Sequence, residues 1–187
     1  MKQNSKGFTV IEMLAVLAIM GVLLAMSLTA YQNSRGQLAL QRSANEIAQS
    51  IRRASEMAMS AKEIGGMIPT GGYGIYFDKN ANPQQIIIFA DCGTVPNHLY
   101  DASGLTCGTF DEKVEEINLE KNIKIQSIFY ASSLNVVNIV FQAPSPKVFI
   151  NNDSPPTGLA TITLFYGDDI TKTKTIQVNE VGLIDVY

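Results

Sequence analysis

The architecture of this chain follows from one stretch, FTVIEMLAVLAIMGVLLAMSLTA, at residues 8–30. Its 23 residues carry a single charge, Glu12, and no proline. A helix that crosses a bilayer needs about 20 apolar residues, so the stretch predicts a membrane-spanning helix. The leader before it, residues 1–7, contains Lys2 and Lys6. By the positive-inside tendency, these cations would keep the N-terminus on the cytoplasmic side.

Three kinds of N-terminal processing are compatible with this segment. A secretory signal would be removed after the small residues around Ala25-Met26-Ser27, although the apolar run is long for such a signal and contains an acid. A plain membrane anchor would stay uncut. A cut between Gly7 and Phe8 would instead leave the whole apolar helix on the mature chain and make Phe8 its first residue.

The third kind of processing accounts for Glu12. A carboxylate in hydrocarbon costs about 3 kcal/mol or more unless it is paired. A cut before Phe8 would create an ammonium about one helical turn from Glu12. The partner could be that ammonium or the N-terminus of a neighbouring subunit. The alternative is that Glu12 is an incidental polar residue that reaches the membrane interface.

The string GFTVIEML, Gly7–Leu14, behind a short leader with two lysines, resembles the class III signal of type IV pilins and type II secretion pseudopilins. The resemblance implies cleavage between Gly7 and Phe8 by a prepilin peptidase, N-methylation of Phe8, and a role for Glu12 in subunit assembly. It implies other pilin or pseudopilin subunits, an inner-membrane assembly platform and membrane lipid as partners. The expected location is the inner membrane, crossed once with the head exported, and then a periplasmic or extracellular filament.

The resemblance favours a minor subunit over a major one. Many major pilins carry a proline within the apolar segment, whereas this chain has none before Pro69. The layout of a long helix, a glycine pair and then only strands resembles the FimT/GspH-like branch of minor pilins and pseudopilins. Some members of that branch are thought to bind DNA through C-terminal arginines, which this chain lacks.

The helical pattern continues beyond the apolar stretch. Small and apolar residues recur in steps of four and three, which places them on one helix face. They are Leu40, Ala44, Ile47, Ile51, Ala54, Ala58 and Ala61. We interpret this stripe as a core face rather than a coiled-coil seam because it is short. Gly65-Gly66 is predicted to end the helix, since glycine accepts positive φ.

After Gly66 the pattern changes to the period of two that is typical of strands. The expected strands are 71–77, 84–90, 117–120, 123–131, 136–143, 147–150 and 159–167, with a last segment at 175–187 broken by Gly182. The predicted fold is therefore α+β and pilin-like. A long N-terminal helix, with a transmembrane part at 8–30 and an amphipathic part at 31–64, packs on an antiparallel β-rich head at 65–187.

Cys92 and Cys107 are the only cysteines. In an exported head a disulfide between them is the expected state, although two free thiols would also be compatible. The bond would close a loop of about 15 residues and contribute about 3 kcal/mol in the chain-entropy model. Together with His98 they fall short of a four-ligand zinc site.

The remaining patterns argue against an enzyme and against nucleic acid. From Gly65 onward the chain has 13 acids and 7 lysines, so no nucleic-acid partner is expected. His98 is the single histidine, read as a surface loop residue, and no GxSxG elbow is present. The acidic run at 111–116 is interpreted as a solvated turn or helical face. No cofactor is expected, although the oxygens of Gly167-Asp168-Asp169 could bind calcium.

Two other functions stay open from the sequence. The same scaffold could carry a head that binds DNA or a surface. An anchored or secreted protein with an ordinary signal could have a different function altogether, although no catalytic constellation is recognised for it.

Overall fold

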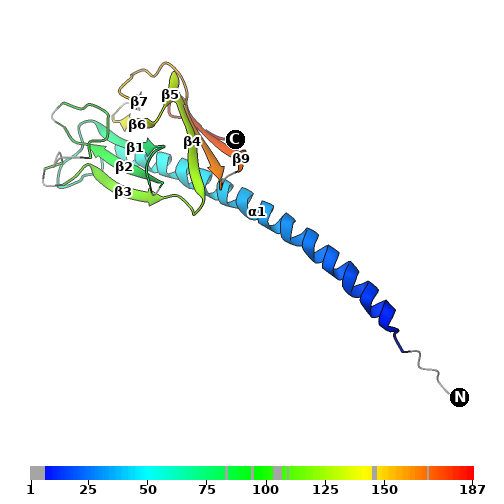
Figure 1. Cartoon of the computed structure of the whole chain (residues 1–187). Helices are drawn as coiled ribbons and strands as arrows, with labels where there is room; N and C mark the ends of the chain where they lie inside the picture. Colours follow the sequence, from blue (N-terminus) through cyan, green and yellow to red (C-terminus); the bar gives the residue numbers. More distant parts are fainter. Residues whose placement is uncertain are drawn as a thin grey trace. The chain divides into compact units, whose positions relative to one another are not determined.

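The computed structural model describes residues 7–82, 84–93, 95–102, 107–108, 110–144, 147–167 and 169–187 (Figure 1). The chain divides into two compact units, an N-terminal unit at Met1–Leu38 and a head unit at Ala39–Tyr187. One helix, α1 at Val10–Met59, belongs to both. Lys2 and Lys6, in the predicted leader, lie outside the described residues.

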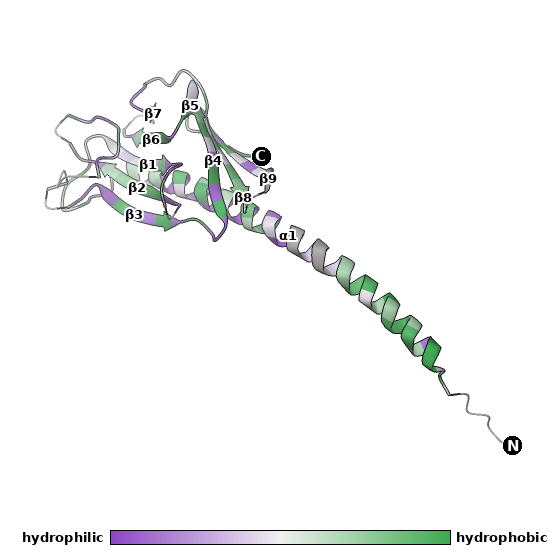
Figure 2. Ribbon diagram, viewed as in Figure 1, coloured by the Kyte–Doolittle hydropathy of each residue, from purple (hydrophilic) through white to green (hydrophobic). Residues whose placement is uncertain are grey.

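Between Val10 and Ser27, α1 is apolar apart from Glu12 and Ser27, and this end of the helix is mostly green in Figure 2. The segment Val10–Ser27 has a mean hydropathy of 2.4, and none of it is buried within the protein. Helices that are apolar on all sides are found in large cores or in membranes. Ser27 donates its hydroxyl to the Leu23 carbonyl at 2.9 Å, which satisfies that polar group within the helix. By length and composition, this helix can cross a membrane.

The predicted end of the helix at Gly65-Gly66 is wrong, because α1 ends at Met59. Ala61 adopts a left-handed φ of 48°. Its N–H bonds to the Ala58 carbonyl and the N–H of Lys62 bonds to the Met57 carbonyl, both at 3.1 Å. This pair of bonds is a Schellman motif, which satisfies the last helical carbonyls and stops the helix. Gly65 and Gly66, with φ of 59° and 80°, form a separate tight turn.

The predicted core stripe of the helix is confirmed within the head unit. Ala44, Ile47, Ile51 and Ala54 are fully buried, and Leu40 and Ala58 are nearly so. Ala61 is the exception, since it lies beyond the helix end and is exposed. The stripe is therefore a face packed on the chain's own domain, as the sequence indicated.

The head unit contains two five-stranded antiparallel sheets (Figure 1). The first has the order β3-β2-β1-β6-β7 and the second the order β10-β9-β8-β4-β5. The strands are β1 Gly72–Asp78, β2 Gln85–Asp91, β3 Lys113–Asn118, β4 Ile123–Tyr130, β5 Ser132–Leu134, β6 Val136–Gln142, β7 Lys147–Ile150, β8 Ala160–Tyr166, β9 Asp169–Val178 and β10 Ile184–Val186.

One hydrophobic core joins the buried stripe of α1 to both sheets. On β1, the side chains of Tyr73, Ile75 and Phe77 alternate into this core, as strand geometry requires. Tyr76, between them, faces the other side and packs on a second, smaller cluster. The first sheet therefore has apolar side chains on both faces.

Two details of the strands differ from the sequence prediction. The acidic run at 111–116 is not a solvated turn, because its second half pairs with β2 as the edge strand β3. Glu112, just before that strand, is 1% exposed. The short strand β5 was not predicted, whereas the break at Gly182 does separate β9 from β10.

Candidate processing and assembly site

The Gly7–Phe8 bond lies in an exposed segment that precedes the helix. Neither residue is helical, and the Phe8 side chain is 83% exposed. Nothing lies within 4 Å of the position that a Cβ on Gly7 would occupy. The bond is therefore open to a protease, because cleavage requires an extended, accessible backbone.

Thr9 and Glu12 form a reciprocal cap at the start of α1. Glu12 Oε2 accepts a hydrogen bond from the Thr9 backbone N–H at 2.8 Å and from the Thr9 hydroxyl at 2.9 Å. The Glu12 N–H bonds to Thr9 Oγ1 at 3.4 Å. With Thr9 at the N-cap position and Glu12 three residues later, this is a capping box. Thr9 was not predicted from the sequence, although the spacing Thr-x-x-Glu before an apolar run is the known signal of a capping box.

The capping box gives Glu12 hydrogen-bond donors but does not neutralise its charge. Both Thr9 donors bind the same oxygen, Oε2. They are uncharged, so the carboxylate keeps a net negative charge at the head of the apolar helix. The helix N-terminus favours this charge in part, since the N-terminal amides carry partial positive charge. A cationic partner would complete the site.

Cys92 and Cys107 form the predicted disulfide in the head unit. Cys107 is fully buried, and its Sγ lies 3.6 Å from the Ala90 carbonyl at the end of β2. The bond closes the connection that leads from β2 to β3, with 15 residues of sequence separation. It belongs to the head and not to the processing site.

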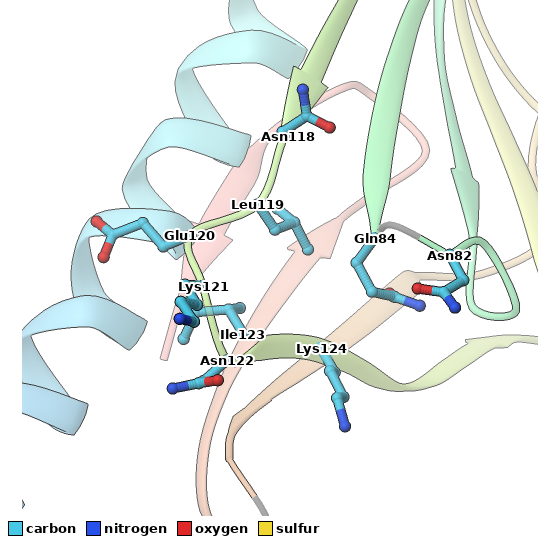
Figure 3. A pocket seen from close by; sticks show the side chains of 9 residues that line it. All are labelled: Asn82, Gln84, Asn118, Leu119, Glu120, Lys121, Asn122, Ile123 and Lys124. Carbon is cyan, nitrogen blue, oxygen red and sulfur yellow. The ribbon is translucent and has the colours of Figure 1, made fainter.

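A surface pocket of about 240 Å³ lies between the β1–β2 and β3–β4 connections (Figure 3). The Gln84 amide that lines it donates to the carbonyls of Lys79 and Ala81 and accepts from the Ile125 N–H. Its one acid, Glu120, pairs with Arg42 on α1 at 3.0 Å. The pocket lining offers no histidine, cysteine or serine to act as nucleophile or base.

The predicted calcium site is not tested, since Asp168 lies outside the described residues. Among the described residues, no three His, Cys, Asp or Glu side chains form a group that could hold a metal ion. The interpretation of His98 as a surface residue is wrong: it is 7% exposed. Asp91, Glu112 and Asn138 are further buried polar side chains that sequence analysis did not single out.

Residues 2–28 match the family described as the prokaryotic N-terminal methylation motif. The N-terminal segment of the chain therefore carries this motif. The match covers the Gly7–Phe8 bond, the Thr9–Glu12 cap and the apolar helix, and it ends before the head unit.

Solved structures similar to this chain include two crystal forms of the type IV minor pilin FimU from Pseudomonas aeruginosa. Their TM-scores are 0.46 and 0.47, with 12% and 11% sequence identity. Each alignment covers 79% of this chain, and 87% and 92% of those chains. No curated protein matches the sequence.

Proposed function

We propose that this protein is a structural subunit, of the minor class, in a type IV pilus-like filament or a type II secretion pseudopilus. The observation that carries the proposal is the position of Glu12. It is the single charge in an exposed apolar helix, and it lies directly behind an accessible Gly7–Phe8 bond. Neither a plain anchor nor an ordinary signal peptide requires a carboxylate there.

Processing prepares the subunit for assembly. A prepilin peptidase hydrolyses the Gly7–Phe8 amide, which leaves a carboxylate on Gly7 and an amino group on Phe8. N-methylation of Phe8 keeps that amino group protonated and cationic. The apolar helix holds the processed subunit in the inner membrane while its head unit is exported. The assembly platform then moves subunits from this membrane pool into the filament.

Glu12 supplies the pairing step. In hydrocarbon its charge is costly, and the Thr9 donors offset only part of that cost. The methylated ammonium of a neighbouring subunit removes the remainder by forming an ion pair. Such a pair fixes the axial position of one helix against the next, because a shift by even one helical turn, 5.4 Å, would separate the charges.

Substitutions at Glu12 and Thr9 separate the pairing role from the capping role. Glu12→Gln removes the charge, whereas Thr9→Val removes the two hydrogen bonds of the Thr9 hydroxyl and leaves the carboxylate and its bond from the residue 9 backbone N–H in place. We expect both variants to be cleaved at Gly7–Phe8 and to stay in the membrane. Glu12→Gln is expected to be lost from sheared filaments or the pseudopilus fraction. Thr9→Val is expected to remain in it.

The readouts are the mass shift on cleavage and the amount of subunit in the filament fraction, both by immunoblot. If the Glu12→Gln subunit were processed and assembled as well as the natural chain, Glu12 would have no pairing role. Equal losses for Glu12→Gln and Thr9→Val would mean that Glu12 acts only as a helix cap.

A further inference from the structure

Tyr31 and Arg35 lie on α1 directly after its apolar segment. The apolar stretch of the sequence ends at Ala30. Both side chains are exposed, that of Tyr31 by 58%. The guanidinium carbon of Arg35 lies over the Tyr31 ring, 5.2 Å from the ring centroid. A cation within about 6 Å of an aromatic ring is attracted to its face, so the two side chains hold each other in place. They are named the Tyr31–Arg35 pair here.

The charge of Arg35 has no acidic partner among the described residues. The sequence contains no acid between Glu12 and Glu46, so no carboxylate of α1 lies within two helical turns of Arg35. The ion pairs of the described residues do not include Arg35, whereas the next arginine, Arg42, pairs with Glu120. A guanidinium offers five N–H donors in a fork that matches the oxygens of a phosphate. Arg35 is therefore suited to an anionic partner outside the chain.

The spacing of the pair along α1 matches the layers of a bilayer. From Val10 to Tyr31 the helix rises about 32 Å, and the hydrocarbon core of a bilayer is about 30 Å thick. Arg35 lies about 6 Å beyond Tyr31 along the helix axis. The headgroup region extends about 5–8 Å beyond the core on each side. When the apolar segment fills the core, Tyr31 therefore reaches its boundary and Arg35 reaches the phosphates.

The two residue types suit these two layers. Tyrosine is enriched at membrane interfaces because its ring is apolar and its hydroxyl is polar. Arginine is stable among headgroups, where its N–H groups meet phosphate oxygens. A deeper position of α1 would carry the Arg35 charge into hydrocarbon. A shallower one would carry apolar side chains such as Leu24, which is 65% exposed, into water. The pair therefore opposes displacement of the helix in both directions.

We propose that the Tyr31–Arg35 pair is a lipid-binding site that fixes the depth of α1 in the membrane. The Tyr31 ring lies at the hydrocarbon boundary of the leaflet opposite the N-terminus, and the Arg35 guanidinium binds the phosphate of a phospholipid headgroup there. The inference rests on one part of the proposed function, a helix that crosses the membrane. It needs neither cleavage nor assembly, so the uncleaved chain alone can test it, and its failure would leave the role of Glu12 untouched.

Contact between Arg35 and lipid phosphate can be measured in vesicles. The full uncleaved chain, with ¹³C at the guanidinium carbon of its arginines, is placed in vesicles of phosphatidylethanolamine and phosphatidylglycerol. The buffer contains no phosphate, so that every phosphorus nucleus belongs to a lipid. We expect solid-state NMR to show dephasing of the arginine signal by ³¹P, and Arg35→Gln should remove it. Arg52→Gln is the matched control, because it removes an exposed arginine of the head unit from the same helix. It should leave the dephasing in place. Absence of dephasing in the natural chain, or dephasing that survives Arg35→Gln, would overturn the proposal.

The depth of residue 31 can be read from a single fluorophore, because the chain contains no tryptophan. Tyr31→Trp keeps an aromatic ring beside Arg35. Lipids brominated near the headgroup end of the acyl chain should quench its fluorescence more than lipids brominated near the terminal methyl. Leu23→Trp is the control, since Leu23 is exposed and lies about 12 Å from Tyr31 along the helix, towards the bilayer centre. It should show the reverse order of quenching.

The contribution of Arg35 to this depth is tested by adding Arg35→Gln to Tyr31→Trp. The preference for the shallow quencher should weaken, because the phosphate contact no longer holds the helix at one depth. Unchanged quenching would mean that Arg35 does not set the depth and would contradict the proposal. It would also fail if Tyr31→Trp were quenched in the same order as Leu23→Trp, or by neither lipid, because the ring would then lie in hydrocarbon or in water.

Discussion

Ala61 ends helix α1 in a conformation that suits glycine better than alanine. Its φ of 48° lies in the left-handed region, where a Cβ crowds the following carbonyl. The two Schellman hydrogen bonds to Met57 and Ala58 require that conformation. Alanine is tolerated there because those bonds and the bond from the Tyr73 hydroxyl to the Lys62 carbonyl, at 2.7 Å, hold the turn in place.

Ala61→Gly should stabilise the head unit. Glycine removes the left-handed strain, worth about 1 kcal/mol, although its freedom in the unfolded chain offsets part of the gain. We expect the free energy of unfolding, from urea titration of the full chain in detergent, to rise by about 0.5 kcal/mol. Ala54→Gly is the matched control, since Ala54 is helical and fully buried. It should lower the free energy by about 1 kcal/mol. A destabilised Ala61→Gly variant would show that the turn does not store this strain.

At the residue scale, short sequence patterns identified some of the residues discussed above and missed others. Glu12 was predictable because one acid in an apolar run is conspicuous, and Thr9 was within reach of the capping-box spacing. His98 was not. Its ring stacks on Phe149 of β7, which is distant in sequence, and its backbone N–H bonds to Asp91 at the end of β2. Nothing within a few residues of His98 indicates that residues 97–101 fold over the first sheet.

Helix α1 is held in the head unit mainly by its apolar face rather than by its ion pairs. Ile51 is fully buried in the main core. Arg53, two residues later, forms a bidentate pair with Glu115 on β3, but the two side chains are 53% and 35% exposed. Exposed ion pairs contribute about 0–1 kcal/mol, because water and salt screen the charges.

Two alanine substitutions on α1 test this ranking. Ile51→Ala should lower the free energy of unfolding by about 2–5 kcal/mol, through lost burial and the cavity left behind. Arg53→Ala should change it by less than about 1 kcal/mol, and less still in high salt. Both effects can be measured in the same urea titration. If Arg53→Ala were the more damaging substitution, the helix would be held by charge.

At the element scale, the periodic patterns of the sequence predicted those helices and strands that depend mainly on residues close in sequence. The buried stripe of α1 and most strands follow from the 3.6-residue and two-residue periods. The strand predicted at 117–120 begins earlier, at Lys113, because charged residues separate its apolar positions and the register shifts in its pairing with β2. Val114 and Ile117, which both pack against the main core, are therefore three residues apart and do not show a period of two. The division of the strands between two sheets was also beyond the sequence. The chain changes sheet between β3 and β4, between β5 and β6, and between β7 and β8, and those pairings depend on long-range contacts.

At the scale of the whole molecule, one chain joins a segment suited to lipid with a head suited to water. The apolar Val10–Ser27 is entirely unburied within the protein, whereas the head has its own core and disulfide. The proposed assembly role therefore requires the apolar helix to remain on the mature chain. Cleavage at Gly7–Phe8 keeps it, and cleavage near Ser27 would remove it.

The mass of the mature N-terminus, measured on protein purified from membranes of cells that supply a prepilin peptidase, tests this requirement most directly. The mature chain is expected to begin at Phe8 and to carry one added methyl group. Gly7→Leu serves as the control, because it alters the residue before the cut and should leave the leader attached. A chain that begins at Met1 would leave a plain anchor with an unexplained carboxylate. A chain that begins near Leu28 would mean a secreted protein without its helix, and would contradict the assembly role.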